Sequence, residues 1–210
     1  MLDGVMRRVV APPLDALAGL AVARGIGADA VTLVGAAFGI ACGACVALGW
    51  FGPALVCLAA SRIADGLDGA IARRTAMTDF GGFLDIVCDF AFYASVPVGF
   101  ALFDYGRCAL PAVLLLASFY LNGASFLAFS ALAAKRGLMT EVRGPKSLYF
   151  TTGLMEGTET IAFFGAFLIW PQQFALLATA FAGLCLLTMG ARVLLARRVF
   201  AVDDPARPQH

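Results

Sequence analysis

The sequence has 210 residues, of which 61% are hydrophobic and only 14% charged, and its formal net charge is +1. Its mean hydropathy of +0.87 is typical of a chain that folds in lipid, and it excludes an ordinary water-soluble globular domain. We therefore predict an integral membrane protein.

Residues 1–28 precede the first long apolar run and differ from it in composition. They carry three arginines around a modest apolar stripe, which consists of Val9, Val10, Leu14, Leu17 and Leu20. The stripe is interrupted, whereas a secretory signal peptide has one continuous apolar core. It suits an amphipathic helix that lies in the membrane interface. An ordinary first helix packed on the rest of the protein explains the same pattern equally well.

Residues 29–200 are expected to form one domain of six transmembrane helices, because a bilayer crossing needs about 20 apolar residues. The apolar runs of this kind are 30–50, 53–73, 80–103, 109–134, 148–170 and 173–195. Their connections are short, so one compact all-α bundle accommodates them without a linker. The polar, proline-containing tail at 201–210 is expected to be disordered.

Lys and Arg residues predict the orientation of this bundle, because loops that stay in the cytoplasm retain positive charge. Six crossings place both termini on one side, which holds Arg7, Arg8, Arg24, Arg73, Arg74, Lys135, Arg136, Arg143, Lys146, Arg192, Arg197, Arg198 and Arg207. The opposite loops hold only Arg107. We therefore expect an inner-membrane protein with both termini in the cytoplasm. The asymmetry favours contact with anionic lipid headgroups over nucleic acid.

Four aspartates lie in one short stretch, SRIADGLDGAIARRTAMTDFGGFLDIVCDF, between strongly apolar runs. Asp65 and Asp89 are equally far from the turn between the second and third spans, so they are level with each other. The same holds for Asp68 and Asp85. Spacings of three and four residues place the acids of each helix on one face. They would lie roughly 10–15 Å below the cytoplasmic helix ends, where exposure to lipid is costly, so we expect them to line a polar cavity.

Four carboxylates this close would repel one another if all were ionised, so a positive partner is expected. Oxygen ligands alone suit hard divalent ions such as Mg²⁺ or Mn²⁺, and two ions would neutralise the cluster. A cation or proton pathway through a transporter is the alternative use of buried acids. Gly66, Gly69, Gly81 and Gly82 leave room beside the acids for a bulky ligand or for close helix packing. Arg73 adds a planar cation suited to phosphate.

The order of these residues is Asp65-x-x-Asp68-Gly69-x-x-Ala72-Arg73, then Gly81-x-x-x-Asp85-x-x-x-Asp89. This pattern resembles the signature of the CDP-alcohol phosphotransferases (CDP-alcohol phosphatidyltransferases), membrane enzymes that make phospholipids. Six spans after an amphipathic helix also fit this family, so the resemblance covers nearly the whole chain. Two features depart from it. Seven residues separate Arg73 from Gly81 where members often have eight, and Asp29 stands where many carry Asn.

The resemblance implies a role for each residue of the pattern. Asp65, Asp68 and Asp85 would bind divalent metal, with two ions of Mg²⁺ or Mn²⁺ in the site. Asp89 would help to hold the second ion or act as the general base. A carboxylate can serve as the base in this chain, whose one histidine, His210, is the last residue and is expected to lie in a disordered tail. The CDP pocket would be lined by Gly69, Ala72, Arg73 and Gly81.

The reaction that the resemblance implies is transfer of a phosphatidyl group from a CDP-linked lipid, such as CDP-diacylglycerol, to a small polar alcohol, with release of CMP. It also implies a homodimer. A cation-coupled transporter is the second hypothesis, and a catalytically silent, lipid-binding membrane protein of the same fold is the third.

The acceptor alcohol is less well defined by the sequence. The candidates for its binding site are Arg143, Lys146, Glu156 and Glu159. The two basic residues suit an acceptor phosphate, and the two glutamates suit acceptor hydroxyls. Positive-inside anchoring and a buried structural ion pair explain the same residues about as well.

Overall fold

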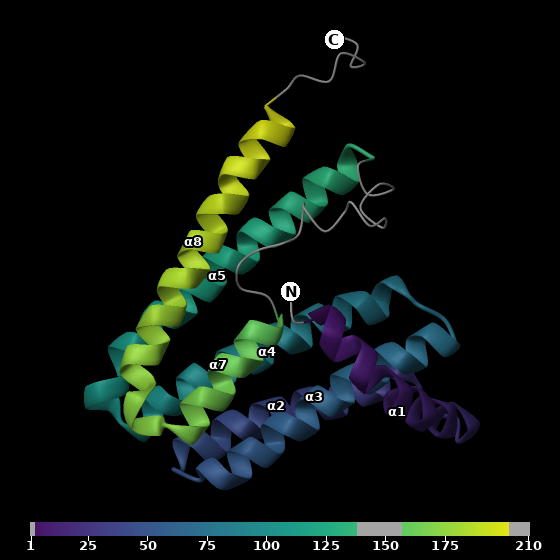
Figure 1. Ribbon diagram of the computed structural model, residues 1–210, viewed down its shortest axis with the longest axis horizontal. Coiled ribbons are helices and arrows are strands. Elements are labelled where there is room, and N and C mark those ends of the chain that lie inside the picture. The colour runs from purple at the N-terminus through teal and green to yellow at the C-terminus, as the bar shows by residue number, and fades with distance from the viewer. Residues whose placement is uncertain (1–2, 138–156, 202–210) are drawn as a thin grey trace.

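The computed structural model describes residues 3–137 and 157–201, which form helices joined by short turns (Figure 1). The elements in chain order are α1 (Asp3–Ala23), α2 (Ala28–Ala47), α3 (Phe51–Arg74), α4 (Asp79–Phe103), α5 (Tyr105–Lys135), α7 (Gly157–Ile169), the 3₁₀ turn η2 (Pro171–Gln173) and α8 (Phe174–Phe200). The predicted all-helical class is thus confirmed for this part of the chain. The tail at 202–210 lies outside the described residues.

Within residues 3–137 and 157–201, four helices are long and apolar enough to cross a membrane: α2, α4, α5 and the unit of η2 and α8. Helix α3 has 24 residues, but Arg62, Asp65 and Asp68 interrupt its apolar sequence. Helix α7 has 13 residues, and the N-terminal part of its predicted span, 148–156, lies outside the described residues. A multi-pass helical architecture is therefore supported, and the count of six crossings stays a prediction.

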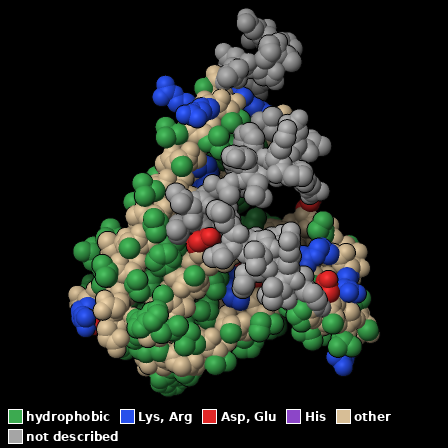
Figure 2. All heavy atoms as spheres, viewed as in Figure 1, with side chains coloured by type: hydrophobic (Ala, Val, Ile, Leu, Met, Phe, Trp, Pro, Cys, Tyr) green, Lys and Arg blue, Asp and Glu red, His purple; other side chains and the backbone are tan. Residues whose placement is uncertain are grey.

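Large apolar side chains cover much of the outside of the molecule. Val56, Leu102 and Leu176 are 69%, 69% and 68% exposed, and they come from three different helices. In Figure 2, hydrophobic side chains are spread over much of the lower part of the visible face, and most Lys and Arg side chains appear toward its edges. Such a surface suits contact with lipid, because a water-soluble protein rarely exposes apolar patches of this extent.

The helix ends are built by residues suited to tight turns. Gly49 has φ of +74°, and the Trp50 amide donates to the Cys45 carbonyl at 2.8 Å, which closes the end of α2. Thr78 caps the N-terminus of α4, where its hydroxyl accepts a hydrogen bond from the Gly81 amide at 3.0 Å. These short connections reverse the chain between α2 and α3 and again between α3 and α4, and α2 packs against both of the other helices.

Helix α2 packs against both α3 and α4, and glycines bring its backbone close to theirs. Gly35, Gly39 and Gly43 recur every four residues on one face of α2. A Cβ atom on Gly43 would collide with the Ser95 carbonyl oxygen, and one on Gly99 would collide with the Gly43 carbonyl oxygen. Small residues at this spacing are typical of close helix packing in membranes.

Phenylalanine side chains fill the core between α4, α7 and α8. Phe100 and Phe174 stack with ring centroids 4.0 Å apart and 6° between their planes. Phe163 and Phe181 stack at 4.3 Å and 2°. These rings hold the C-terminal half of α4 in place, while its N-terminal half carries the aspartates. Helices α5 and α8 run side by side in Figure 1.

Helix α1 confirms that the N-terminal segment is helical, and it lies on α3. Ala18 and Ala21 are buried there against Ala70 and Ile71. This contact agrees with the interpretation of residues 1–28 as an ordinary first helix packed on the rest of the protein. Its place in the membrane interface stays a prediction.

Candidate active site

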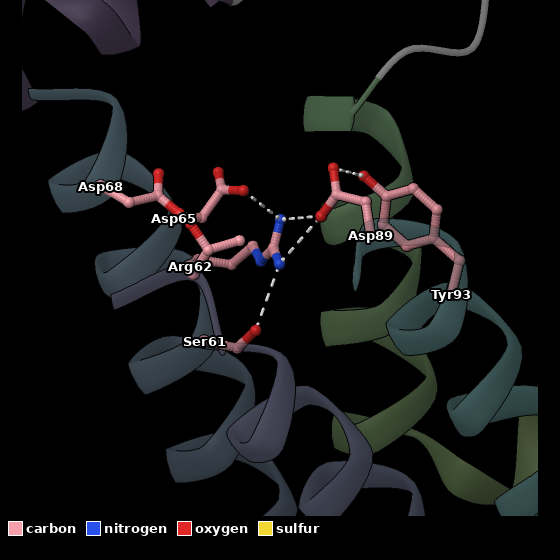
Figure 3. Close-up of polar contacts among 7 residues, drawn as sticks. Ser61, Arg62, Asp65, Asp68, Asp89 and Tyr93 are labelled. Carbon is pink, nitrogen blue, oxygen red and sulfur yellow. Dashed lines mark hydrogen bonds and ion pairs between the residues drawn. The ribbon is translucent and has the colours of Figure 1, made fainter. Parts of the chain in front are cut away.

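The acidic side chains of α3 and α4 converge, as their distances from the turn predicted (Figure 3). Asp65, Asp85 and Asp89 each offer a carboxylate oxygen, and these three oxygens lie within 4.8 Å of one another. The carboxylates of the two helices therefore lie together in one small volume. The assignment of these acids as metal ligands stays a prediction.

Asp68, on α3, connects the acid cluster to a third helix, α2. It is only 7% exposed, and the Thr32 hydroxyl of α2 donates to its Oδ2 at 2.6 Å. All four aspartates line one cavity of about 10 Å³ between α2, α3 and α4. That volume is close to the smallest that admits a single water molecule, so the cavity has the size of an ion site.

Arg62 supplies positive charge within the cluster. Its Nη1 lies 3.2 Å from Oδ1 of Asp89 and 3.5 Å from Oδ1 of Asp65. Its Nη2 donates to Oγ of Ser61 at 3.2 Å and to Asp89 Oδ1 at 3.3 Å. The guanidinium carbon also lies 4.6 Å from the centroid of the Phe92 ring. A cation thus lies between two of the acids, and it belongs to the chain itself.

Asp89 is held from both sides. Its Oδ1 accepts from Arg62, and its Oδ2 accepts from the Tyr93 hydroxyl at 3.3 Å. Sequence reasoning missed Tyr93, although its position four residues after Asp89 places it on the same face of α4. It also missed Thr32, for which the sequence gives no signal, because the contact depends on how α2 docks.

The residues of this cluster fit a divalent cation. The donors are carboxylate oxygens, which Mg²⁺ and Mn²⁺ prefer. Three of them lie close enough together to share an ion, and a guanidinium already lies between Asp65 and Asp89. The site therefore accommodates positive charge where the sequence predicted it.

The predicted CDP-binding residues lie at the N-terminal end of α4 and the C-terminal part of α3. A Cβ atom on Gly69 would lie 3.2 Å from Nη1 of Arg73, so the glycine leaves room for that guanidinium. A Cβ atom on Gly81 would lie 3.3 Å from Oδ1 of Asp29. Ala72 is half-buried, and Arg73 is exposed. Asp29 thus approaches this predicted pocket from α2.

A second, larger cavity of about 810 Å³ adjoins the acids and is lined by residues of α4, α5, α7 and α8. Asp89 and Tyr93 line it, so Asp89 faces both cavities. Its lining is mainly apolar and includes Arg192 of α8. The Arg192 Nη1 donates to the backbone and side-chain oxygens of Asn122, both at 2.9 Å, and to Oγ of Ser125 at 2.7 Å.

The four predicted acceptor residues are placed only in part. Glu159 lies in the first turn of α7 and is half-buried, while its neighbours Gly157 and Thr160 line the large cavity. The other three candidates, Arg143, Lys146 and Glu156, lie outside the described residues. Arg192 is a cation that sequence reasoning assigned only to the cytoplasmic side, and the structure adds it to the cavity beside Asp89.

Solved structures share the fold of this chain. The crystal structure of phosphatidylinositol phosphate synthase (PgsA1) of Mycobacterium tuberculosis with CDP-DAG bound matches with a TM-score of 0.72 and 20% identity, over 92% of this chain and 98% of that one. The same enzyme in complex with manganese and citrate matches with a TM-score of 0.72 and 20% identity, over 94% and 95% of the two chains.

Sequence comparison gives the relationship directly. The chain is 45% identical over 193 residues to the inner membrane protein YnjF of Escherichia coli (strain K12), an alignment that spans 92% of this chain and 94% of YnjF. The model of the CDP-alcohol phosphatidyltransferase family matches residues 26–196, which include the complete acidic pattern of α3 and α4. This chain belongs to the CDP-alcohol phosphatidyltransferase family.

Proposed function

We propose that this protein transfers a phosphatidyl group from a CDP-activated lipid to an alcohol and releases CMP, as a step of phospholipid biosynthesis. The observation that carries the proposal is the convergence of Asp65, Asp85 and Asp89 at the family pattern. The relative PgsA1 has been solved with CDP-DAG and with manganese, which supports CDP-diacylglycerol as donor and a divalent ion as cofactor.

Metal binding is assigned to the acids as the sequence predicted. Asp65, Asp68 and Asp85 would hold Mg²⁺ or Mn²⁺, and Asp89 would contribute to a second ion. Divalent cations held there would neutralise the pyrophosphate of the donor and so make CMP a better leaving group. The Thr32 hydroxyl, at 2.6 Å from Asp68, fixes the direction in which that carboxylate points.

Proton transfer is assigned to Asp89, because it faces both the acid cavity and the large cavity. The acceptor hydroxyl oxygen forms a bond to the β-phosphorus, while the bond from that phosphorus to the bridging oxygen breaks. CMP leaves with the bridging oxygen and the bonding electron pair, and Asp89 takes the acceptor proton. Tyr93 donates to Oδ2 of Asp89 and orients the carboxylate for this step.

The donor headgroup is assigned to Gly69, Ala72, Arg73 and Gly81. The guanidinium of Arg73, exposed in the last turn of α3, has the forked donors that recognise phosphate oxygens. The two glycines lack side chains at points where polar groups come close, which suits the approach of a bulky nucleotide.

The acceptor alcohol is assigned to the large cavity, because Asp89 lines it. Arg192 places a guanidinium in the same cavity and is added to the acceptor candidates Arg143, Lys146, Glu156 and Glu159. The acceptor is a polar alcohol small enough for this space. The relationship to YnjF supports the bacterial inner membrane as location. The distribution of Lys and Arg supports an orientation with the acids toward the cytoplasm and both termini on that side. A homodimer is the proposed assembly.

The direct test uses the purified full-length protein in detergent or nanodiscs with CDP-diacylglycerol and a panel of alcohols, both free and phosphorylated. We expect CMP release that requires Mg²⁺ or Mn²⁺ and an accompanying phosphatidyl-alcohol product. If CMP is released with none of the alcohols, the transferase proposal is wrong. Metal-coupled flux in protein-containing vesicles without CMP release would instead identify the cation-coupled transporter.

Replacing Thr32 by valine removes the hydrogen bond to Asp68 but keeps the size of the side chain. Partners that orient a ligating side chain typically contribute about 10- to 100-fold in metal affinity or activity. We expect the Mn²⁺ concentration for half-maximal CMP release to rise by about 10-fold or more in Thr32→Val. Thr32→Ser keeps the hydroxyl and serves as the matched control. Equal metal dependence in both variants would show that Thr32 does not position Asp68.

A further inference from the structure

We propose that Arg62 is an internal competitor for the divalent cation: its guanidinium takes the position between Asp65 and Asp89 and must leave when that position is loaded with metal. The inference rests on the proposed metal-binding role of the acids. It assigns to Arg62 the control of metal affinity at this family site.

The geometry carries the first step of the argument. One nitrogen, Nη1 of Arg62, lies 3.2 Å from Asp89 and 3.5 Å from Asp65, so a single positive group bridges both helices. The oxygens of these two acids belong to the same group within 4.8 Å that would coordinate an ion. A guanidinium and a metal ion cannot both occupy the space between these oxygens, so binding of one excludes the other.

The surroundings of Arg62 give its guanidinium a defined resting place. Ser61 accepts from Nη2 at 3.2 Å, and the face of the Phe92 ring lies 4.6 Å from the guanidinium carbon. The side chain of Arg62 is 21% exposed, so its charge is only partly screened by solvent. An aromatic face and a hydroxyl both favour a cation at this point.

The hydrogen bonding of the Arg62 guanidinium in this position is incomplete, which favours its displacement by a metal ion. Nε of Arg62 is buried, and among the described residues it has no hydrogen-bond partner. A buried donor without a partner raises the free energy of the conformation that contains it. A guanidinium that swings out regains this hydrogen bond from water, so the metal-loaded state recovers part of what the ion pairs lose.

The electrostatic consequence has a definite sign. With Arg62 in place, the acid cluster carries one less net negative charge, and two of its oxygens are engaged. Removing the guanidinium frees the oxygens and restores the charge, so metal affinity must increase. If Arg62 instead worked together with the metal, for example as a permanent substitute for the second ion, its removal would weaken binding or leave it unchanged.

The test measures Mn²⁺ binding to metal-stripped, full-length protein by the EPR signal of free Mn²⁺, without any substrate. We expect Arg62→Gln to bind Mn²⁺ at least about 10-fold more tightly than the unmodified protein, because a positive charge within about 4 Å of the acid oxygens is removed. Arg107→Gln, at the start of α5 and away from the acids, is the charge-matched control and should leave affinity unchanged. Unchanged or weaker Mn²⁺ binding in Arg62→Gln would overturn the proposal.

A milder variant covers the case in which Arg62→Gln does not fold. Ser61→Ala removes only the hydroxyl that accepts from Nη2 and keeps all charges. We expect Mn²⁺ to bind about 2- to 10-fold more tightly in Ser61→Ala, since one hydrogen bond that holds the guanidinium is lost. No increase would count against the proposal. Because neither assay uses CDP-lipid, the competitor role can fail while CMP release is observed, and it can hold when CMP release is absent.

Discussion

Asp89→Asn is expected to release CMP from CDP-diacylglycerol about 100- to 10,000-fold more slowly than the unmodified protein, the usual contribution of a general base. The asparagine side chain keeps the shape of Asp89, and its amide oxygen still accepts the hydrogen bond from Arg62. Its amide nitrogen takes the place of the oxygen that faces the Tyr93 hydroxyl, and it donates to that hydroxyl. The asparagine cannot take the proton of the acceptor hydroxyl. The measurement is the rate of CMP release with saturating donor and acceptor.

Two controls separate loss of the base from loss of metal. The Asp89→Asn rate is measured over a wide range of Mn²⁺ concentrations, because Asp89 is also a proposed ligand of the second ion. Asp15→Asn, a change of the same chemistry at an exposed position of α1, should retain full activity. An Asp89→Asn protein that keeps more than about a tenth of the activity would remove Asp89 from the role of base.

Gly43→Ala is expected to have the largest effect on stability. The new Cβ atom would collide with the Ser95 carbonyl oxygen, which belongs to the backbone of α4 and cannot turn away as a side chain can. Overpacking of this kind costs about 1–3 kcal/mol. We expect a clearly lower thermal unfolding temperature in detergent, with reduced activity because α2 also carries Thr32.

Gly183→Ala is the matched control. Gly183 lies within α8, and a Cβ atom there would meet nothing within 4 Å. Alanine is favoured over glycine inside a helix by about 1 kcal/mol, so this variant should unfold at an equal or higher temperature. Equal unfolding temperatures for the two variants would show that α2 and α4 do not pack as closely as described.

The sequence predicted the part of the site that depends on one helix pair. Asp65 and Asp89 lie at equal distances from one short turn, so helix geometry alone brings them level, and their oxygens are close in the structure. The direction of Asp68 was not predictable in this way. It points to Thr32, and that contact exists only because α2 docks on α3.

Arg62 shows a second limit of sequence reasoning. Its position three residues before Asp65 allows a contact within α3, and the structure shows one at 3.5 Å. The closer contact, at 3.2 Å, is with Asp89 on α4, and it depends on side-chain direction and on the Phe92 ring. The sequence assigned the neutralisation of the acids to metal ions and did not predict that Arg62 would lie between Asp65 and Asp89.

The crossings were predictable from hydropathy where a helix is uniformly apolar. Helices α2, α4 and α5 lie close to the predicted spans because each has one continuous apolar run. Helix α3 is formed as expected but carries the site residues, which lower its hydropathy below that of its neighbours. The charged residues of the candidate site thus interrupt the apolar run from which a membrane crossing is predicted.

Asp89 is the one aspartate of the cluster that lines both cavities, so the two cavities meet at its side chain. The small cavity lined by the four aspartates is built by α2, α3 and α4, whereas most of the larger cavity comes from α5, α7 and α8. Under the proposed function, substitutions in α5, α7 and α8 can therefore change which alcohol is used and leave the acids of α3 and α4 in place. Relatives with new products should differ mainly in that C-terminal half.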